Sequence, residues 1–284
     1  MRRDALWGAA LLLGAALCTA CGSDDERLPQ PSEAVAAPAE EGAAQETWTM
    51  RVGGERSGQT KALTLDGENN LVSSWARGEK VYVCRQEGST MHLVGTLSAA
   101  ADGDVSELTG SLTGSFKTGD KLWLYTCPIA FAYSGQDGTL EGIASRFDPM
   151  EADAVITVDE ERREISASAV FQPLHAVCRF VFVDDNGNSL SVSRLSITAD
   201  RLVNRYDGNY EPVCNDEALT VTPATPATSL YVSMADTEPD GGSEKVTYTF
   251  TATVGDKTYE GTKRAKLKNG SFNRAVRVTL SPKS

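Results

Sequence analysis

The stretch GDKLWLYTC, residues 119–127, shows how this chain builds its fold. A Gly-Asp turn leads directly into an extended run in which Trp123, Tyr125 and Cys127 alternate with other residues. Side chains two residues apart in a strand lie on the same face of a sheet. The stretch therefore predicts a short β-strand that begins immediately after a tight turn.

A second stretch, GEKVYVC at residues 78–84, repeats this turn-then-strand pattern. Its Tyr82 and Cys84 share one face. If the two strands pair, Cys84 and Cys127 come within bonding range, so we name them as a possible disulfide. The four cysteines after the N-terminal region could form disulfides in an oxidising compartment or remain buried thiols, and the sequence leaves both states open for Cys84, Cys127, Cys178 and Cys214.

Short strand-like runs recur on both sides of these stretches, separated by turn signals. Only residues 140–147 are typical of a helix, and Asn269-Gly270 predicts a hairpin that joins the last two strands. Pro173 interrupts the pattern, because proline removes a backbone donor. The sequence thus predicts an all-β, mainly antiparallel fold of two tandem β-sandwich domains, residues 47–172 and 173–284, with one short helix near residues 140–147.

The N-terminus is typical of an export signal. Arg2 and Arg3 precede a short apolar run that ends in small residues before Cys21, which resembles a bacterial lipoprotein signal. We expect residues 1–20 to be a signal peptide, Cys21 to be lipidated, and the acidic, Pro- and Ala-rich residues 21–46 to be a flexible tether. The acidic residues 24–26 resemble the tag that sends Bacteroidetes lipoproteins to the outer face of the outer membrane.

The charge balance excludes several kinds of partner. The chain has 27 basic and 39 acidic residues, a formal net charge of −12. Nucleic-acid binding needs a basic patch, and an anionic membrane surface attracts basic segments, so neither contact is expected. The expected link to the membrane is the lipid on Cys21.

No pattern of catalytic or metal-ligating residues is evident. The two histidines, His92 and His175, have no metal-ligand spacing, and no Gly-x-Ser-x-Gly or Walker-type loop occurs. We therefore predict a non-enzyme without a metal or other cofactor.

Several stretches, in this order along the chain, resemble the fimbrillin family of Bacteroidales-type fimbrial subunits. They are residues 60–63, 75–81, 119–122, 133–140, 174–180 and 248–280. The resemblance covers most of residues 47–280 and implies tandem β-sandwich domains in a lipid-anchored protein of the cell surface or fimbrium. It also implies assembly with other fimbrial subunits, in homo- or heteropolymers, by strand addition to an exposed sheet edge.

The resemblance further implies processing by an arginine-specific protease at or before the first strand. Many relatives have Arg where this chain has Lys61, so the candidate sites here are Arg51 and Arg56. Cleavage would free the strand at residues 47–52, and a strand of the next subunit would replace it. Without cleavage the protein would serve as an anchor or stand alone, and the sequence leaves open whether it is shaft, tip or anchor.

A second hypothesis is a surface glycan-binding lipoprotein of an uptake system. Such a site needs exposed aromatic side chains that stack on sugars, and the candidates are Trp48, Trp75 and Trp123. A host or bacterial surface ligand is also compatible with the fimbrial adhesin hypothesis.

Overall fold

The computed structural model describes residues 46–56, 64–65, 71–72, 74–128, 130–235 and 245–283. The predicted signal peptide, Cys21, the tether up to residue 45, and residues 57–63 with Lys61 lie outside the described residues. In the part that is described, no helix has the length and apolar character needed to cross a membrane. All the residues that the structure describes fall within one compact unit.

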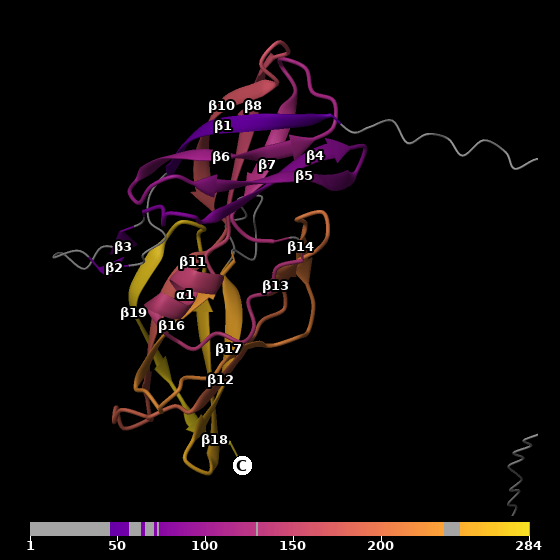
Figure 1. The fold of residues 1–284 in the computed structure, drawn as a ribbon. Helices are drawn as coiled ribbons and strands as arrows, with labels where there is room; N and C mark the ends of the chain where they lie inside the picture. The colour runs from indigo at the N-terminus through magenta and orange to yellow at the C-terminus, as the bar shows by residue number, and fades with distance from the viewer. Residues whose placement is uncertain are drawn as a thin grey trace, which may run out of the picture. The chain divides into compact units, whose positions relative to one another are not determined.

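Seven strands of the first half form one sheet that closes on itself (Figure 1). Their order is β1–β6–β5–β4–β7–β8–β10, β1 also pairs with β10, and β9 is added beside β10. All of these pairs are antiparallel except β1–β10. The strands are β1 (Thr47–Arg56), β4 (Lys80–Glu87), β5 (Thr90–Ala99), β6 (Val105–Thr113), β7 (Lys121–Tyr125), β8 (Met150–Val155), β9 (Thr157–Asp159) and β10 (Glu164–Pro173).

This closed sheet differs from the two stacked sheets predicted for the first domain. The mainly antiparallel all-β class is confirmed, while two tandem sandwiches are not. Period-two alternation tells which side chains face inward, but it does not tell which strands become neighbours.

The interior of the closed sheet is apolar. Alternate residues of each strand point inward, and burial of each large side chain contributes about 1.5–3 kcal/mol. Among the buried residues are Trp48, Met50, Val52, Trp75, Val83, Leu97, Leu108, Leu112, Leu124, Ile165 and Phe171.

The second half contains a three-stranded and a five-stranded sheet. Phe180 and Phe250, one from each sheet, lie edge to face with ring centroids 5.0 Å apart, in a second buried cluster. The three-stranded order is β16 (Ser229–Met234), β11 (Ala176–Val183) and β19 (Phe272–Thr279). The five-stranded order is β15 (Leu219–Val221), β12 (Arg194–Thr198), β17 (Val246–Val254), β18 (Lys257–Ala265) and β20 (Ser281–Pro282). Two smaller pairs are β13 (Val203–Tyr206) with β14 (Pro212–Cys214) and β2 (Thr64–Leu65) with β3 (Leu71–Val72).

The predicted hairpin at Asn269-Gly270 is wrong in its strand pairing. A turn does form there, since the Ser271 amide donates to the Lys268 carbonyl at 3.0 Å and Gly270 has a φ of 76°. However, β18 pairs with β17 and β20, whereas β19 pairs with β11 in parallel. The chain therefore crosses from one sheet to the other at this turn.

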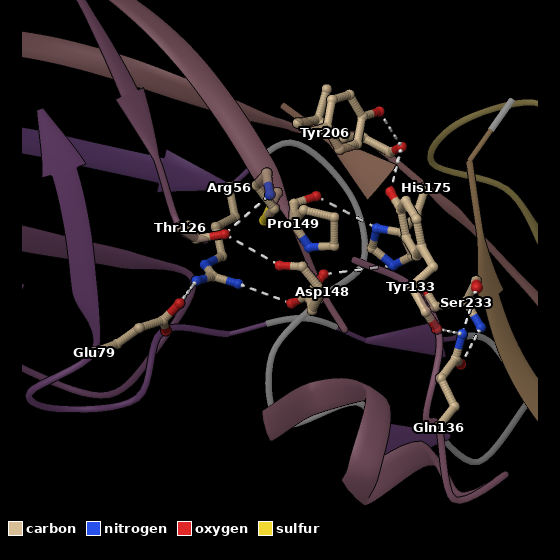
Figure 2. Close-up of polar contacts among 12 residues, drawn as sticks. Arg56, Glu79, Thr126, Tyr133, Gln136, Asp148, Pro149, His175, Tyr206 and Ser233 are labelled. Carbon is tan, nitrogen blue, oxygen red and sulfur yellow. Dashed lines mark hydrogen bonds and ion pairs between the residues drawn. The ribbon is translucent and has the colours of Figure 1, made fainter. Parts of the chain in front are cut away.

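The segment between β7 and β8, residues 126–149, packs against the second cluster. Its helix α1 (Leu140–Arg146) is close to the predicted residues 140–147, and the Thr139 hydroxyl caps it by accepting from the Gly142 amide at 2.9 Å. The Gln136 side chain donates to the Ser233 carbonyl and accepts from the Ser233 amide, each at 2.8 Å (Figure 2). A segment from the first half thus completes the core of the second.

Candidate strand-exchange site

Strand β1 is held by backbone pairing on both of its sides. Residues Thr47–Glu55 pair antiparallel with β6, and residues Thr49–Arg56 pair in parallel with β10. In Figure 1, β1 (indigo) runs beside β6 and close to β10. It is therefore the strand that closes the sheet rather than an edge strand.

The strand predicted for residues 47–52 extends four residues further, through Gly53 and Gly54, to Arg56. A Cβ on Gly54 would lie 2.8 Å from Cδ1 of Leu108 and 3.3 Å from the Trp75 ring. The Trp75 indole nitrogen donates to the Gly54 carbonyl at 3.2 Å. Glycine is favoured here because any side chain would displace Leu108 and Trp75, and neighbouring strands on both sides keep the backbone extended.

The inward face of β1 is buried along its full length. Its residues alternate strictly between exposed and buried, and Met50 and Val52 have no exposed surface. The Trp48 indole donates to the Gly114 carbonyl at 2.9 Å and lies edge to face with the Phe116 ring, with centroids 6.3 Å apart. If β1 left, the closed sheet would lose this apolar row together with two backbone ladders.

At its C-terminal end, β1 places a charge in the protein interior. The Arg56 guanidinium forms an ion pair with Glu79, and its Nη1 lies 3.6 Å from Oδ2 of Asp148 (Figure 2). These side chains are 0–3% exposed, and the guanidinium lies 3.9 Å from the centroid of the Trp75 ring. Buried charges persist only when they are paired, so Arg56 and its two carboxylates stabilise one another.

The network continues into the second half through His175. Its Nε2 lies 3.5 Å from Oδ1 of Asp148, and the two side chains are almost fully buried. Burial lowers the pKa of His175, while the Asp148 charge and the Pro149 carbonyl oppose this shift. The position of β1 is thus linked to the residue that directly precedes β11.

The two predicted processing sites differ in accessibility. Arg51 points outward from the middle of β1, its side chain is 53% exposed, and it pairs with Glu107 at 3.2 Å. Arg56 is 1% exposed and lies in the network described above. Arg51 is paired through the backbone with both β6 and β10, while Arg56 is paired with β10 and its amide donates to the Asp104 carbonyl at 3.3 Å. A protease can therefore engage either residue only when β1 leaves the sheet. Cleavage itself stays a prediction.

The four described cysteines are free thiols in the structure. Cys84 and Cys127 are both buried, and the Tyr210 hydroxyl hydrogen-bonds the Cys84 thiol and donates to the Cys127 carbonyl at 3.2 Å. Desolvation raises the pKa of the Cys84 thiol to about 11, which makes it a poor nucleophile. A bond between Cys84 and Cys127 stays a prediction.

Two of the three candidate tryptophans are core residues. Trp48 and Trp75 are at most 3% exposed and serve the interior of the closed sheet. Trp123 is half-buried and lines two surface cavities on the outer face of that sheet. Of the three, only Trp123 can contact a ligand.

Sequence reasoning missed Glu79 and Asp148, which lie 69 positions apart and share no motif. The sequence pointed to His175 only as one of two histidines without metal-ligand spacing. Within the described residues, no group of three or more His, Cys, Asp or Glu side chains could hold a metal ion.

No family model matches the chain, and no curated protein matches it. Solved structures that resemble it include two Bacteroides proteins provisionally assigned to cell adhesion and a fimbrial assembly protein. The protein from Bacteroides ovatus is 13% identical with a TM-score of 0.49, covering 84% of this chain and 97% of its own. The one from Bacteroides uniformis is 10% identical with a TM-score of 0.47, covering 84% and 96%. The fimbrial assembly protein from Parabacteroides distasonis is 11% identical with a TM-score of 0.43, covering 83% and 90%.

These structural neighbours are adhesion and fimbrial proteins at low sequence identity. At such identities and TM-scores, a proposal of function must depend on this chain's own residues.

Proposed function

We propose that this chain is a non-catalytic fimbrial subunit or adhesin of the cell surface that assembles with other subunits by exchange of β1. One observation carries the proposal: a single N-terminal strand closes the sheet between β6 and β10. Its departure would expose two strand edges and an apolar groove, and unpaired strand edges bind extended segments of other chains.

An incoming strand has to match the groove in three ways. It needs apolar side chains at alternate positions to replace Trp48, Met50 and Val52. It needs glycine where Leu108 and Trp75 approach Gly54. It also needs a cation for Glu79 and Asp148, which would otherwise be buried without the charge of Arg56.

Processing would provide the trigger for exchange. Arg51 has the more accessible side chain of the two candidate sites, so cleavage would begin there during a transient opening of β1. Uncleaved protein would keep its own strand and act as an anchor or as a stand-alone surface protein.

A reversible lock on β1 tests the proposal. Thr49 and Ser111 are exposed and directly opposite across β1 and β6, so Thr49→Cys with Ser111→Cys can form a disulfide in a Cys214→Ser background. Protein that begins at residue 47 would be treated with an arginine-specific protease and followed by sedimentation. We expect polymers under reducing conditions, monomers when the lock is oxidised, and polymers again after reduction.

A matched lock controls for the disulfide itself. Thr247→Cys with Arg264→Cys joins two exposed, directly opposite residues of β17 and β18 and leaves β1 untouched. It should polymerise equally in both redox states. If the variant with the β1 lock polymerised equally when oxidised and when reduced, strand exchange through β1 would be excluded.

Surface anchoring is the second part of the proposal. The signal and the small residues before Cys21 support attachment to the outer membrane by lipid. Metabolic labelling with a fatty-acid probe should mark the natural chain and not Cys21→Ala. Equal labelling of both would exclude Cys21 as the modified residue.

A further inference from the structure

A cavity of about 380 Å³ opens on the outer face of the closed sheet, away from the inward row of β1. This volume lies within the range of small-molecule sites. Strands β7 and β8 and the turn between β13 and β14 supply its principal side chains, which are Trp123, Tyr125, Glu151, Asn209, Tyr210 and Glu211.

Aromatic rings form one wall of the cavity. Tyr125 and Tyr210 are stacked with centroids 3.5 Å apart and planes at 4°. Trp123 is two residues before Tyr125 in β7, so it lies on the same outer face, and it remains half-buried. The alternating aromatic residues of the stretch 119–127 therefore form part of β7 and also line a cavity on the protein surface.

The turn that carries Tyr210 is built with backbone strain. Asp207 Oδ1 accepts from the amides of Asn209 at 2.7 Å and Glu211 at 3.1 Å. Between them Tyr210 has a φ of 58°, which a bulky residue rarely adopts. Such strain persists only where surrounding contacts enforce it, and it is concentrated at ligand sites. Here it stacks the Tyr210 ring on Tyr125 in the aromatic wall, and Asn209 and Glu211 on either side of it in the sequence also line the cavity.

The charges of the lining are all negative. Glu151 lies directly opposite Tyr125 across the β7–β8 pair, and Glu211 lies close enough to influence it. Partial desolvation, with the charges of Asp153 and Glu211, raises the pKa of Glu151. The lining contains no basic side chain, and neither carboxylate has an ion pair within the described part of the chain.

A smaller cavity of about 190 Å³ adjoins the first. The two share Trp123 and Glu151 in their linings, so they are neighbours on the outer face of the sheet. The only basic residue of the second cavity is Lys121, whose Nζ is already paired with Asp153 at 2.8 Å.

We propose that these neighbouring cavities bind a neutral saccharide of two or more rings, with Trp123 packing against a pyranose face and Glu151 and Glu211 accepting from sugar hydroxyls. An indole presents a flat apolar face to the C–H groups of a sugar ring. Carboxylates are strong hydroxyl acceptors, and the Gln86 amide can donate and accept. The Asn209 amide nitrogen can donate, while its Oδ1 already accepts from the Met91 amide at 3.1 Å. Sialylated and sulfated glycans are repelled, because both free charges of the lining are negative. The site gives a fimbrial subunit a ligand of its own, and it does not depend on strand exchange.

A printed array of neutral, amino-sugar, sialylated and sulfated oligosaccharides tests the site, with the purified full chain as probe. The best neutral hit is then titrated by calorimetry against Trp123→Ala and Glu211→Gln, and thermal unfolding verifies that each variant is folded. Glu211 is exposed, so Glu211→Gln should fold normally, and it can still test the site if Trp123→Ala is unstable. Glu161→Gln, an exposed acid in the turn after β9, is the matched control.

We expect binding to neutral glycans that is at least about tenfold weaker in Trp123→Ala and in Glu211→Gln, and unchanged in Glu161→Gln. Any of four results would overturn the proposal. These are absence of glycan binding, preference for sialylated or sulfated members, full affinity in both cavity variants, or binding of spermidine at this site without binding of any glycan. The last result would assign the cavity to amines instead.

Discussion

Arg56 Nη1 lies 3.6 Å from Asp148 Oδ2, and solvent reaches at most 1% of either side chain. Arg56 ends the first strand of the chain, whereas Asp148 follows the helix α1, whose segment packs against the second core. Any movement of β1 out of the sheet must separate this pair. The pair therefore connects the proposed exchange of β1 to the junction between the two halves.

Substituting Arg56 should be far more destabilising than substituting Arg51. Arg56→Met leaves Glu79 and Asp148 buried without their cation, which should cost about 3–5 kcal/mol of unfolding free energy. Arg51→Met removes one exposed ion pair, worth at most about 1 kcal/mol. Urea unfolding monitored by tryptophan fluorescence measures both. Equal losses in the two variants would show that the buried network does not hold β1.

Gly54 and Gly53 provide a second matched comparison on β1. Gly54→Ala forces a methyl group against buried Leu108 and should lower stability by about 1–3 kcal/mol. Gly53→Ala meets nothing closer than 3.9 Å and should change stability by less than about 0.5 kcal/mol. If the clash with Leu108 is the cause, Gly54→Ala should lower the unfolding free energy less in a Leu108→Val background than in the natural chain. An unchanged difference would refute this cause.

His175 should make stability depend on pH. Burial lowers its pKa in the folded state, so the unfolded chain binds a proton that the folded chain resists. The contribution of neutral His175 to the unfolding free energy is fully present above the unfolded pKa of about 6.5. It is lost as the pH falls from there toward the lowered folded pKa.

The measurement is the unfolding free energy between pH 8 and pH 4.5 for the natural chain and for His175→Gln. The natural chain should show an additional slope below pH 6.5, of at most about 1.4 kcal/mol per pH unit. Parallel curves would mean that His175 does not titrate differently in the two states. Because other groups titrate in both proteins, only the difference between the curves is informative.

The division of the chain at residue 173 stays a prediction, and the segment of residues 126–148 allows a sharper test of it. Tyr133 and Gln136 belong to that segment but bond to Asn204 and Ser233 of the second half. A fragment of residues 173–284 should therefore lack a cooperative unfolding transition. Fusing residues 126–148 to its N-terminus through a short Gly/Ser linker should restore one. A cooperative transition in the shorter fragment would show that the second core is independent.

The sequence by itself determined the strands, because inward and outward positions alternate every two residues. Residues 119–127 illustrate this, since their turn and alternation predicted β7 and the shared face of Trp123 and Tyr125, although β7 ends at Tyr125, before Cys127. The helix near residues 140–147 was equally local, because its cap and first turn lie within a few residues of each other. The end of β10 at Pro173 follows from the missing backbone donor.

Tertiary structure alone decided which strands became neighbours and which side chains met. The turn at Gly270 formed as predicted, yet β19 joined β11 because pairing depends on the whole buried face rather than on the nearest turn. From the sequence Arg56 was only a candidate processing site, whereas the tertiary structure buries it beside Glu79 and Asp148 at the end of β1. Likewise, Trp123 and Glu211 are 88 positions apart and line one cavity only after the two halves have packed. Local alternation is encoded by neighbouring residues, whereas these contacts require long-range closure of the chain, which no short stretch of sequence specifies.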